Sequence, residues 1–440
     1  MSDYVSLLMF PALLIALFLG FPVAFSMMGV ALVFGLMVFG DAVIFQFVQK
    51  VNDVASNFVL AAVPLFVFMG AMMERSGIAE QLFEAVHLWT RRLPGGLAIG
   101  TIVMCVIFAA STGVIGATET VVGLLAIPVM MKYAYDKGLI SGTICAGGSL
   151  GTIIPPSVVV VVLGPVADVS VGDLFVGMIF PGLIMAAAYI AYILVRCIID
   201  PKAGPRLPRQ PDDMPFMQKV RVTLVALVPP ILMIFAVLGS IMMGWAAPTE
   251  AAGLGALGAA LLSLVYRTFT LGVLKEALIK TVKVTCMITL ILLGGNMFAG
   301  VFVGGGGVAV ANELIADAQL GGWATLALFL LISFIAGFFL DWISVLLIFI
   351  PVFMPLVRAL GFDPVWFCIL FLIVIQTSYL TPPMAPAIFY LRGISPPEIT
   401  LRMMFRGVIP FIILQIITLA FVAAFPELAL WLPSKVLGFN

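Results

Sequence analysis

Twelve long apolar runs divide this chain of 440 residues. About 20 apolar residues make one helical crossing of a bilayer, and a helix satisfies its own backbone hydrogen bonds in lipid. The chain is 63% hydrophobic and 10% charged, so the bilayer must be its solvent, because soluble domains carry about 25% charged residues. The ten-residue alternation of β-barrel strands is missing. The pattern therefore predicts an all-α integral membrane protein with about ten transmembrane helices. The runs fall at about 4–20, 21–40, 58–74, 97–131, 138–165, 174–199, 222–243, 246–266, 284–303, 323–357, 364–391 and 404–425.

Charge and cysteine content exclude several other classes. The net charge is zero, which gives no basic surface for nucleic acid. The five cysteines show no metal-type spacing. We find no HExxH or GxSxG motif, and the single histidine, His87, forms no recognisable catalytic set. We therefore expect neither an enzyme nor a cofactor.

The two halves of the chain match in order and spacing. Pro22 opens an apolar run, and Pro248 opens a similar one 226 residues later; the pair Pro155-Pro156 returns as Pro382-Pro383, at an offset of 227. Such repeats are common in secondary transporters, where the substrate site lies between the halves. We expect a first repeat over 1–200, a cytoplasmic linker over 201–221 and a second repeat over 222–440.

Two runs, 97–131 and 323–357, are too long for single spans. A helix of about 35 residues would exceed about 50 Å, and both runs carry small polar residues in the middle. We interpret both as re-entrant hairpins that turn within the membrane. Each half then crosses five times, so the second half is inverted. With both termini outside, only three Lys and Arg residues lie outside and the other 18 of 21 lie in the cytoplasm, in accord with the positive-inside rule. The three are Lys50, Arg358 and Lys435.

Helix breakers follow each hairpin at mid-depth. The runs 138–165 and 364–391 contain the two Pro–Pro pairs, which remove backbone donors and disfavour helix. Unwound carbonyls can bind a cation, and half-helix N-termini favour an anion. Asp341 is a carboxylate at predicted membrane depth, a position that is usually functional. The alternative interpretations are a simple proline kink and, for Asp341, a structural hydrogen-bond hub in the hairpin tip; Glu119 is a similar but less central carboxylate.

At these motifs the chain resembles the large membrane subunit of the TRAP (tripartite ATP-independent periplasmic) transporters, over about residues 5–425. The motifs are the PTEAA run at 248–252, the IIPPS ending at 153–157, the GFFLD run at 337–341 and Thr381-Pro382-Pro383. The resemblance implies an elevator mechanism in the bacterial inner membrane, with sodium ions as coupling ions and a small organic acid such as a C4-dicarboxylate, sialic acid or 2-oxo acid as cargo. It also implies two partners, a small four-helix membrane subunit and a periplasmic substrate-binding protein.

Carried over residue by residue, the resemblance places substrate and ions at the hairpin tips and broken helices. The implied binding residues are Ser111, Thr112, Gly113, Gly148, Gly151, Thr152, Pro155, Pro156, Ser157, Gly337, Asp341, Thr377, Ser378, Thr381, Pro382 and Pro383. Those nearest sodium would be Ser111, Thr112, Gly148, Gly337, Thr377 and Thr381. The first tip reads AST rather than a Gly-Ser-Ser run, and MAP follows the second Pro–Pro pair, so the ion ligands need not match other members.

Three alternatives stay open from the sequence. A stand-alone carboxylate symporter would need no binding protein. A proton-coupled carrier would use Asp341 and Glu119 in place of sodium. A channel would show a polar ring rather than closed hairpin sites. The identity of the organic acid is not readable from the sequence.

Overall fold

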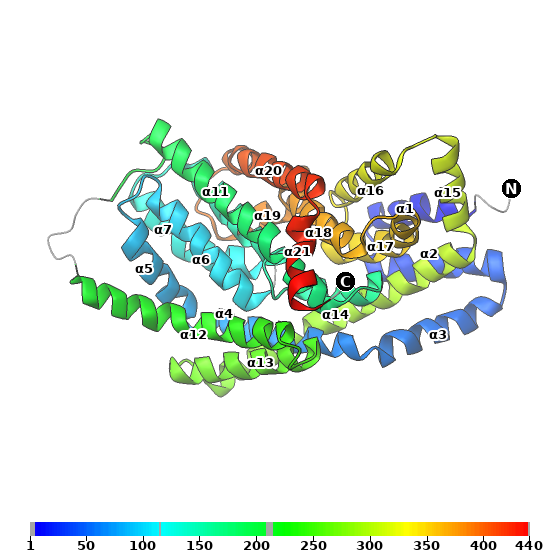
Figure 1. The fold of residues 1–440 in the computed structure, drawn as a ribbon, viewed down its shortest axis with the longest axis horizontal. Helices are drawn as coiled ribbons and strands as arrows, with labels where there is room; N and C mark the ends of the chain where they lie inside the picture. Colours follow the sequence, from blue (N-terminus) through cyan, green and yellow to red (C-terminus); the bar gives the residue numbers. More distant parts are fainter. Residues whose placement is uncertain (1–4, 114–115, 208–213, 439–440) are drawn as a thin grey trace.

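The computed structural model describes residues 5–113, 116–207 and 214–438, and every regular element within these ranges is a helix (Figure 1). The two chain ends, whose side of the membrane the charge pattern predicts, lie outside the described residues. The first half contains η1 (Ser6–Leu8), α1 (Met9–Phe18), α2 (Val23–Phe39), α3 (Ala42–Ser56), η2 (Phe58–Ala61), α4 (Ala62–Glu74), α5 (Ile78–Thr90), α6 (Gly96–Thr112), α7 (Ala117–Lys132), α8 (Lys137–Ser149), η3 (Leu150–Thr152), α9 (Val158–Ala167), α10 (Val171–Gly177) and α11 (Ile179–Ile199). The second half contains α12 (Phe216–Met242), α13 (Pro248–Val265), α14 (Leu271–Gly304), α15 (Gly307–Asp317), α16 (Gly322–Ala336), α17 (Trp342–Ala359), α18 (Pro364–Leu380), α19 (Pro386–Ile394), α20 (Leu401–Ala424) and α21 (Glu427–Val436).

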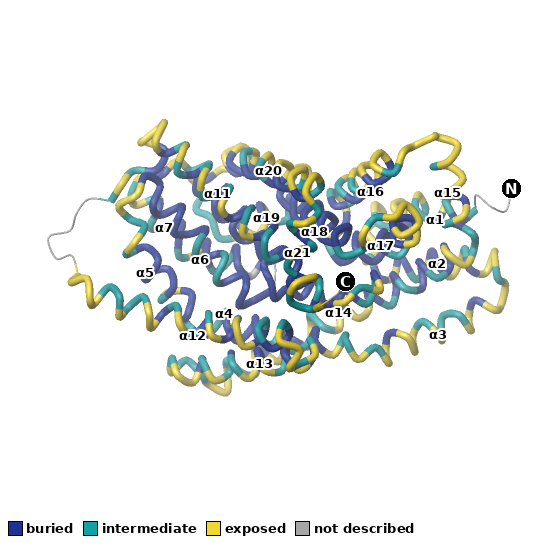
Figure 2. Tube along the Cα trace, in the orientation of Figure 1, coloured by how far each residue is buried: buried dark blue, intermediate teal, exposed yellow. Residues whose placement is uncertain are grey.

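Six helical stretches within the described residues are long and apolar enough to cross a bilayer, or seven if one bent pair is a single span. They are 171–199, 216–242, 248–265, 271–304, 342–359 and 401–424, and the bent pair joins 42–56 to 58–74. Many large apolar side chains are exposed on the outer helices, whereas the central ones are buried (Figure 2). An apolar exterior of this kind requires lipid as solvent, so the chain is an all-helical, multi-pass membrane protein.

Local signals fix where several of these helices begin. Asp136 accepts a hydrogen bond from the Leu139 N–H (2.8 Å) at the start of α8, and Asp363 accepts one from the Trp366 N–H (3.0 Å) at the start of α18. At the start of α13, the Glu250 carboxylate accepts from the Ala247 N–H at 2.8 Å. Each acidic side chain satisfies a free donor of the first turn and complements the helix dipole.

One predicted boundary is absent from the structure. From the apolar runs we expected a separate span at 284–303. The structure instead has one continuous helix, α14, of 34 residues. Its counterparts in the first half, α3 and α4, are separated by a 53° bend. The bend lies at Asn57, whose side chain accepts a hydrogen bond from the Val59 N–H (3.1 Å) and so starts a new helix.

Helices from the two halves interlock in the middle of the molecule. Helix α7 contacts α19, and α17 contacts α9, so the second helix of each hairpin packs on the helix that follows the other half's Pro–Pro pair. Helices α8 and α18 meet where the Gln376 Nε2 donates to the Ser149 Oγ at 3.1 Å. These residues are 227 positions apart, the same offset as the two Pro–Pro pairs. Equivalent positions of the two repeats therefore touch at the centre.

A second group of helices surrounds this centre on one side. Helix α13 packs on α4, and α14 packs on both α2 and α4 (Figure 1). Helices α2 and α13 occupy corresponding positions in the two halves. The contacts of α13 with α4 and of α14 with α2 therefore each join one half of the chain to the other. We call α2, α3, α4, α13 and α14 the outer group, and α6–α9 with α16–α19 the inner group.

Glycines allow a close helix crossing in the inner part, between α8 and α20. A Cβ at Gly407 would lie 2.7 Å from the carbonyl carbon of Gly138, and a Cβ at Gly142 would lie 2.7 Å from the Phe411 ring. Because backbone meets backbone here, neither helix can accept a side chain without moving. Small residues at such crossings let membrane helices approach closely.

We therefore predict that Gly407→Ala destabilises the fold by about 1–3 kcal/mol, as expected for overpacking. Thermal unfolding of the purified protein in detergent measures the effect. Gly239→Ala is the matched control, because a Cβ at Gly239 in α12 meets nothing within 4 Å. Equal melting temperatures for the two variants would contradict the close packing described here.

Candidate transport site

The first hairpin tip ends α6 at Ser111, Thr112 and Gly113, all of which are buried. The Ser111 Oγ donates to the Ile107 carbonyl (2.8 Å), and the Thr112 and Thr118 hydroxyls lie 3.3 Å apart. The Gly113 carbonyl accepts a hydrogen bond from the Val158 N–H (3.3 Å). The tip is thus held against the N-terminus of α9, beyond the first Pro–Pro pair.

Glu119 stands behind this tip and is fully buried. Its Oε2 accepts from the Gly116 N–H at 2.6 Å, which caps α7. Its Oε1 has no hydrogen-bond partner among the described residues. A Cβ at Gly148 would lie 2.5 Å from the Glu119 Cδ, so α8 can pass the carboxylate only because position 148 is glycine.

The helix is broken between α8 and α9, and the break is buried. Gly151 and Thr152 belong to η3, and the chain is non-helical from 153 to 157. The Thr152 Oγ1 donates to the Ser149 carbonyl (2.8 Å), whereas the Ser157 Oγ has no partner among the described residues. The peptide bond between Pro155 and Pro156 is cis. The first break is therefore enclosed by protein.

The second hairpin tip joins α16 to α17 through Gly337–Asp341. Asp341 accepts hydrogen bonds from the Ile343 N–H (3.2 Å) and from the Ser344 hydroxyl, and so caps α17. Asp341 is exposed to the space in front of the tip. A Cβ at Gly337 would lie 2.6 Å from the Ser378 Cβ, so this tip packs directly on α18.

The second break, between α18 and α19, resembles the first in sequence position but not in burial. The hydroxyl groups of Thr377, Ser378 and Thr381 donate hydrogen bonds to backbone carbonyls of α18, at 2.7–2.8 Å. Pro382 and Pro383, again joined by a cis peptide bond, are exposed. The two halves therefore present one closed and one open break.

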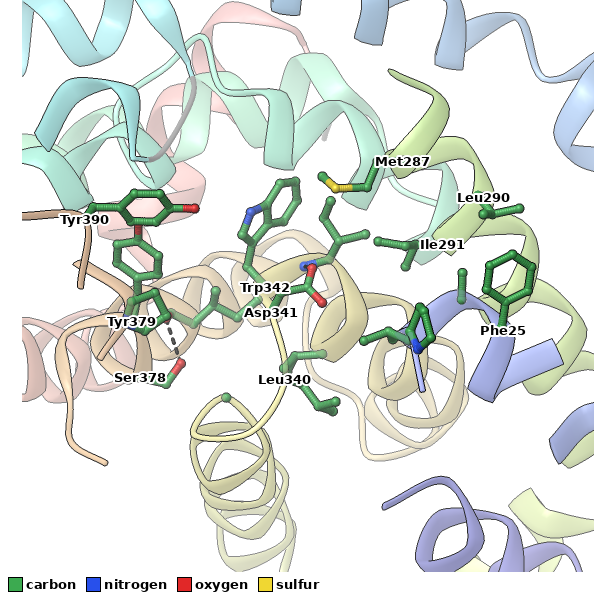
Figure 3. Close-up of a pocket in the computed structure, with 18 residues that line it drawn as sticks. Phe25, Met287, Leu290, Ile291, Leu340, Asp341, Trp342, Ser378, Tyr379 and Tyr390 are labelled. Atoms are coloured by element: carbon green, nitrogen blue, oxygen red, sulfur yellow. Dashed lines mark hydrogen bonds between the residues drawn. The ribbon is translucent and has the colours of Figure 1, made fainter. Parts of the chain in front are cut away.

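Two adjoining cavities separate the tips from the outer group. The first, of about 480 Å³, is lined by Gly337, Asp341 and Ser378 of the inner group, and by residues of α2 and α14 (Figure 3). The second, of about 370 Å³, is lined by Gly113 of the first tip. We call them the tip-2 cavity and the tip-1 cavity. Both are bordered by Met287, Trp342, Ile343 and Tyr390.

The structure thus brings the two tips to two cavities that share four lining residues, but only part of the predicted set lines them. Gly113, Gly337, Asp341 and Ser378 line the cavities. The other predicted residues line neither cavity, and they are Ser111, Thr112, Gly148, Gly151, Thr152, Pro155, Pro156, Ser157, Thr377, Thr381, Pro382 and Pro383.

Sequence reasoning missed the aromatic and charged members of the cavity walls. Trp342 follows Asp341 directly, and Tyr390 of α19 lies against the first tip, where a Cβ at Gly116 would be 3.2 Å from its ring. The described residues that line the two cavities include three charged ones: Asp341, Glu74 and Lys280. Lys280 and Glu74 form an ion pair between α14 and α4. Glu74 ends the apolar run 58–74 and Lys280 precedes the run 284–303, and neither position indicated that the side chain faces a cavity.

The family model described as "Tripartite ATP-independent periplasmic transporter, DctM component" matches residues 10–428. The sialic acid TRAP transporter large permease protein SiaM of Vibrio cholerae is 31% identical over 96% of this chain and 97% of its own length. The C4-dicarboxylate TRAP transporter large permease protein DctM of Pseudomonas aeruginosa is 28% identical over 88% of each chain.

Two further similarities concern architecture. The isethionate TRAP transporter permease protein DctMQ of Oleidesulfovibrio alaskensis is 28% identical over 98% of this chain and 67% of its own length. The crystal structure of the Alcanivorax borkumensis YdaH transporter matches with a TM-score of 0.65 at 14% identity, over 98% of this chain and 99% of that one. The fold is therefore that of a membrane transporter. By the span of the family match and the full-length relatives, the chain belongs to the DctM component family of TRAP transporters, and is a permease subunit rather than an enzyme.

Proposed function

We propose that this chain imports a small organic acid across the bacterial inner membrane by sodium-coupled, elevator-type transport. The observation that carries the proposal is that two hairpin tips, each backed by a broken helix, border two cavities that share four wall residues. Paired interruptions of this kind expose backbone only where protein or a water-filled cavity surrounds it. The inner group would carry substrate and ions, and the outer group would be the static scaffold.

The residues behind the tips suit sodium. Sodium is a hard cation and prefers oxygen ligands, and the tips and breaks supply hydroxyl and carbonyl oxygens from Ser, Thr and unwound backbone. Buried oxygens without partners among the described residues, on Glu119, Ser157 and Tyr379, surround the first tip and both breaks. A buried polar atom normally has a partner. We assign sodium to the regions of Ser111, Thr112 and Gly148, and of Gly337, Thr377 and Thr381.

The substrate's carboxylate would lie in the space between the tips. The N-termini of α9 and α19, which follow the two breaks, offer partial positive charge to an anion. Bound sodium would add full positive charge and offset the cost of removing a carboxylate from water. The named cargoes of the relatives include C4-dicarboxylate, sialic acid and isethionate, which supports an organic acid as the class.

The partners follow from the family. A TRAP system implies a small membrane subunit and a periplasmic binding protein. This chain covers 67% of the DctMQ relative, so about a third of that protein lies outside the match. We propose that a separate four-helix subunit occupies the equivalent place here, and that the binding protein delivers substrate at the outer face. Both termini of this chain would then be periplasmic and the second repeat inverted.

If transport is coupled to sodium, accumulation of substrate must depend on a sodium gradient. Proteoliposomes that contain the chain, its small membrane subunit and the loaded binding protein should accumulate the acid only with an inward sodium gradient. Removal of sodium at constant potassium should reduce uptake at least tenfold. The measurement is filtration of labelled substrate. Full uptake without sodium would reject sodium coupling and transfer the coupling role to protons carried by Asp341 and Glu119.

We also predict that transport depends on the close packing of the second tip on α18. Gly337→Ala should reduce uptake at least tenfold, because the new methyl group meets Ser378 and separates the tip from α18. Gly393→Ala in α19 is the control, since a Cβ there meets nothing within 4 Å. Uptake by both variants, at equal amounts of protein in the vesicles, decides the point. Wild-type uptake by Gly337→Ala would show that the tip need not pack on α18.

A further inference from the structure

Two lysines stand near opposite ends of the scaffold helix α14. Lys280 belongs to its N-terminal third and pairs with Glu74 of α4. Lys50 belongs to α3 and pairs with Asp53 at 3.4 Å. Lys50 reaches α14 at Gly300, where a Cβ would lie 3.1 Å from the Lys50 Cε. Positions 280 and 300 are 20 residues apart in one helix, which is about 30 Å, or the thickness of the hydrocarbon core.

Lys280 faces the moving parts of the transporter. It lines the tip-1 cavity together with Gly113, Gly116 and Tyr390, all of which belong to the inner group or its first tip. Among the described residues that line the tip-1 and tip-2 cavities, Lys280 is the only cation. An anion that leaves the tips through the tip-1 cavity therefore meets Lys280 on the static wall, together with its partner Glu74, which lines the same cavity.

Lys50 has a similar position at the other end. It lines a third cavity, of about 510 Å³, which lies between the scaffold helices α3 and α14 and the inner-group helices α9 and α17. The inner group contributes Pro165 and Pro351, and the scaffold adds the amides Gln46 and Gln49 to the lysine. This cavity shares no lining residue with the tip-1 or tip-2 cavity, and by the charge pattern Lys50 lies on the outer side.

Both ion pairs are open to exchange of partners. The Lys280 and Lys50 side chains are 30% and 37% exposed. An ion pair in contact with water contributes only about 0–1 kcal/mol, so a substrate carboxylate at either mouth can displace the protein's own carboxylate. Lys50 and Asp53 lie in adjacent turns of α3, so their pair joins no two helices, whereas Lys280 and Glu74 link α14 to α4.

We propose that Lys50 and Lys280 are successive docking points for the anionic group of the substrate, at the outer and inner mouths of the transport path. Glu74 and Asp53 hold the two ammonium groups in place while no substrate is present. The inference rests on the proposed function, because it assumes an organic acid that passes between scaffold and tips. Beyond the proposed function, the inference assigns to Lys50 and Lys280 the selection of negatively charged substrates outside the tips.

The test uses the complete transporter in vesicles, with labelled succinate, N-acetylneuraminate and isethionate as probes. Lys50→Gln should raise at least fivefold the concentration of loaded binding protein that gives half-maximal uptake. Lys280→Gln should raise at least fivefold the internal concentration that gives half-maximal efflux from preloaded vesicles. The arginine variants at both positions should stay within twofold of wild type. Lys275→Gln, an exposed lysine of the same helix outside all three cavities, is the control.

The carboxylate partners separate docking from a structural role. If the lysines dock substrate, Glu74→Gln and Asp53→Asn release them and should lower the same half-saturating concentrations, opposite in sign to the lysine variants. If the pairs only stabilise the scaffold helices, loss of either partner should act in the same direction and lower the melting temperature. Equal signs, or lysine variants that match Lys275→Gln, would overturn the proposal.

The outcome also separates this inference from the proposed function. Sodium dependence is measured in the same vesicles, and its loss in wild type would overturn sodium coupling while leaving the lysine comparison intact. Wild-type vesicles that accumulate none of the three anions would overturn organic acid transport and the docking role together.

Discussion

The architecture depends on one constraint: backbone that is not helical cannot face lipid. This chain breaks two helices beside Pro–Pro pairs and must cover both. The first break is covered by the hairpin of its own half. The Gly113 carbonyl accepts a hydrogen bond from the Val158 N–H, and the segment 153–157 is buried. The second is covered on one side by Gly337 against Ser378, while Pro382 and Pro383 remain exposed. An open break therefore needs an aqueous neighbour, and the tip-2 cavity beside it is where Asp341 is exposed.

The matching order of elements in the two halves accounts for how four interrupted elements reach one region. Each hairpin's second helix packs on the post-break helix of the other half, so neither half forms a complete inner group alone. The bond from Gln376 to Ser149, at equivalent positions of the repeats, lies where the halves meet. A second buried bond, from the Gln415 Nε2 to the Tyr189 Oη at 2.8 Å, spans 226 positions. Polar side chains at these crossings fix the pairing of helices whose apolar faces would tolerate slippage.

Sequence alone predicts the elements that depend on local chemistry. Apolar runs mark the helices, and Pro–Pro pairs coincide with the breaks at 155–156 and 382–383, although Pro229-Pro230 lies within the continuous helix α12. The bend between α3 and α4 also had a local signal, because Asn57 can cap a helix; the residue 227 positions later is Val284, which cannot, and α14 continues through it. The cavity walls could not be predicted in this way. Trp342, Tyr390 and Lys280 face the tips only because helices distant in sequence pack together, and no spacing along the chain records that contact.

The unequal helices make the outer group asymmetric. The unbroken α14, with 34 residues, is about 51 Å long, which is more than the thickness of the bilayer, whereas α3 and α4 are separated by a 53° bend at Asn57. Identical helices in the two halves would give the outer group the same shape toward both faces of the membrane. The difference has a local cause, because the asparagine at position 57 can cap a new helix and the valine at position 284 cannot.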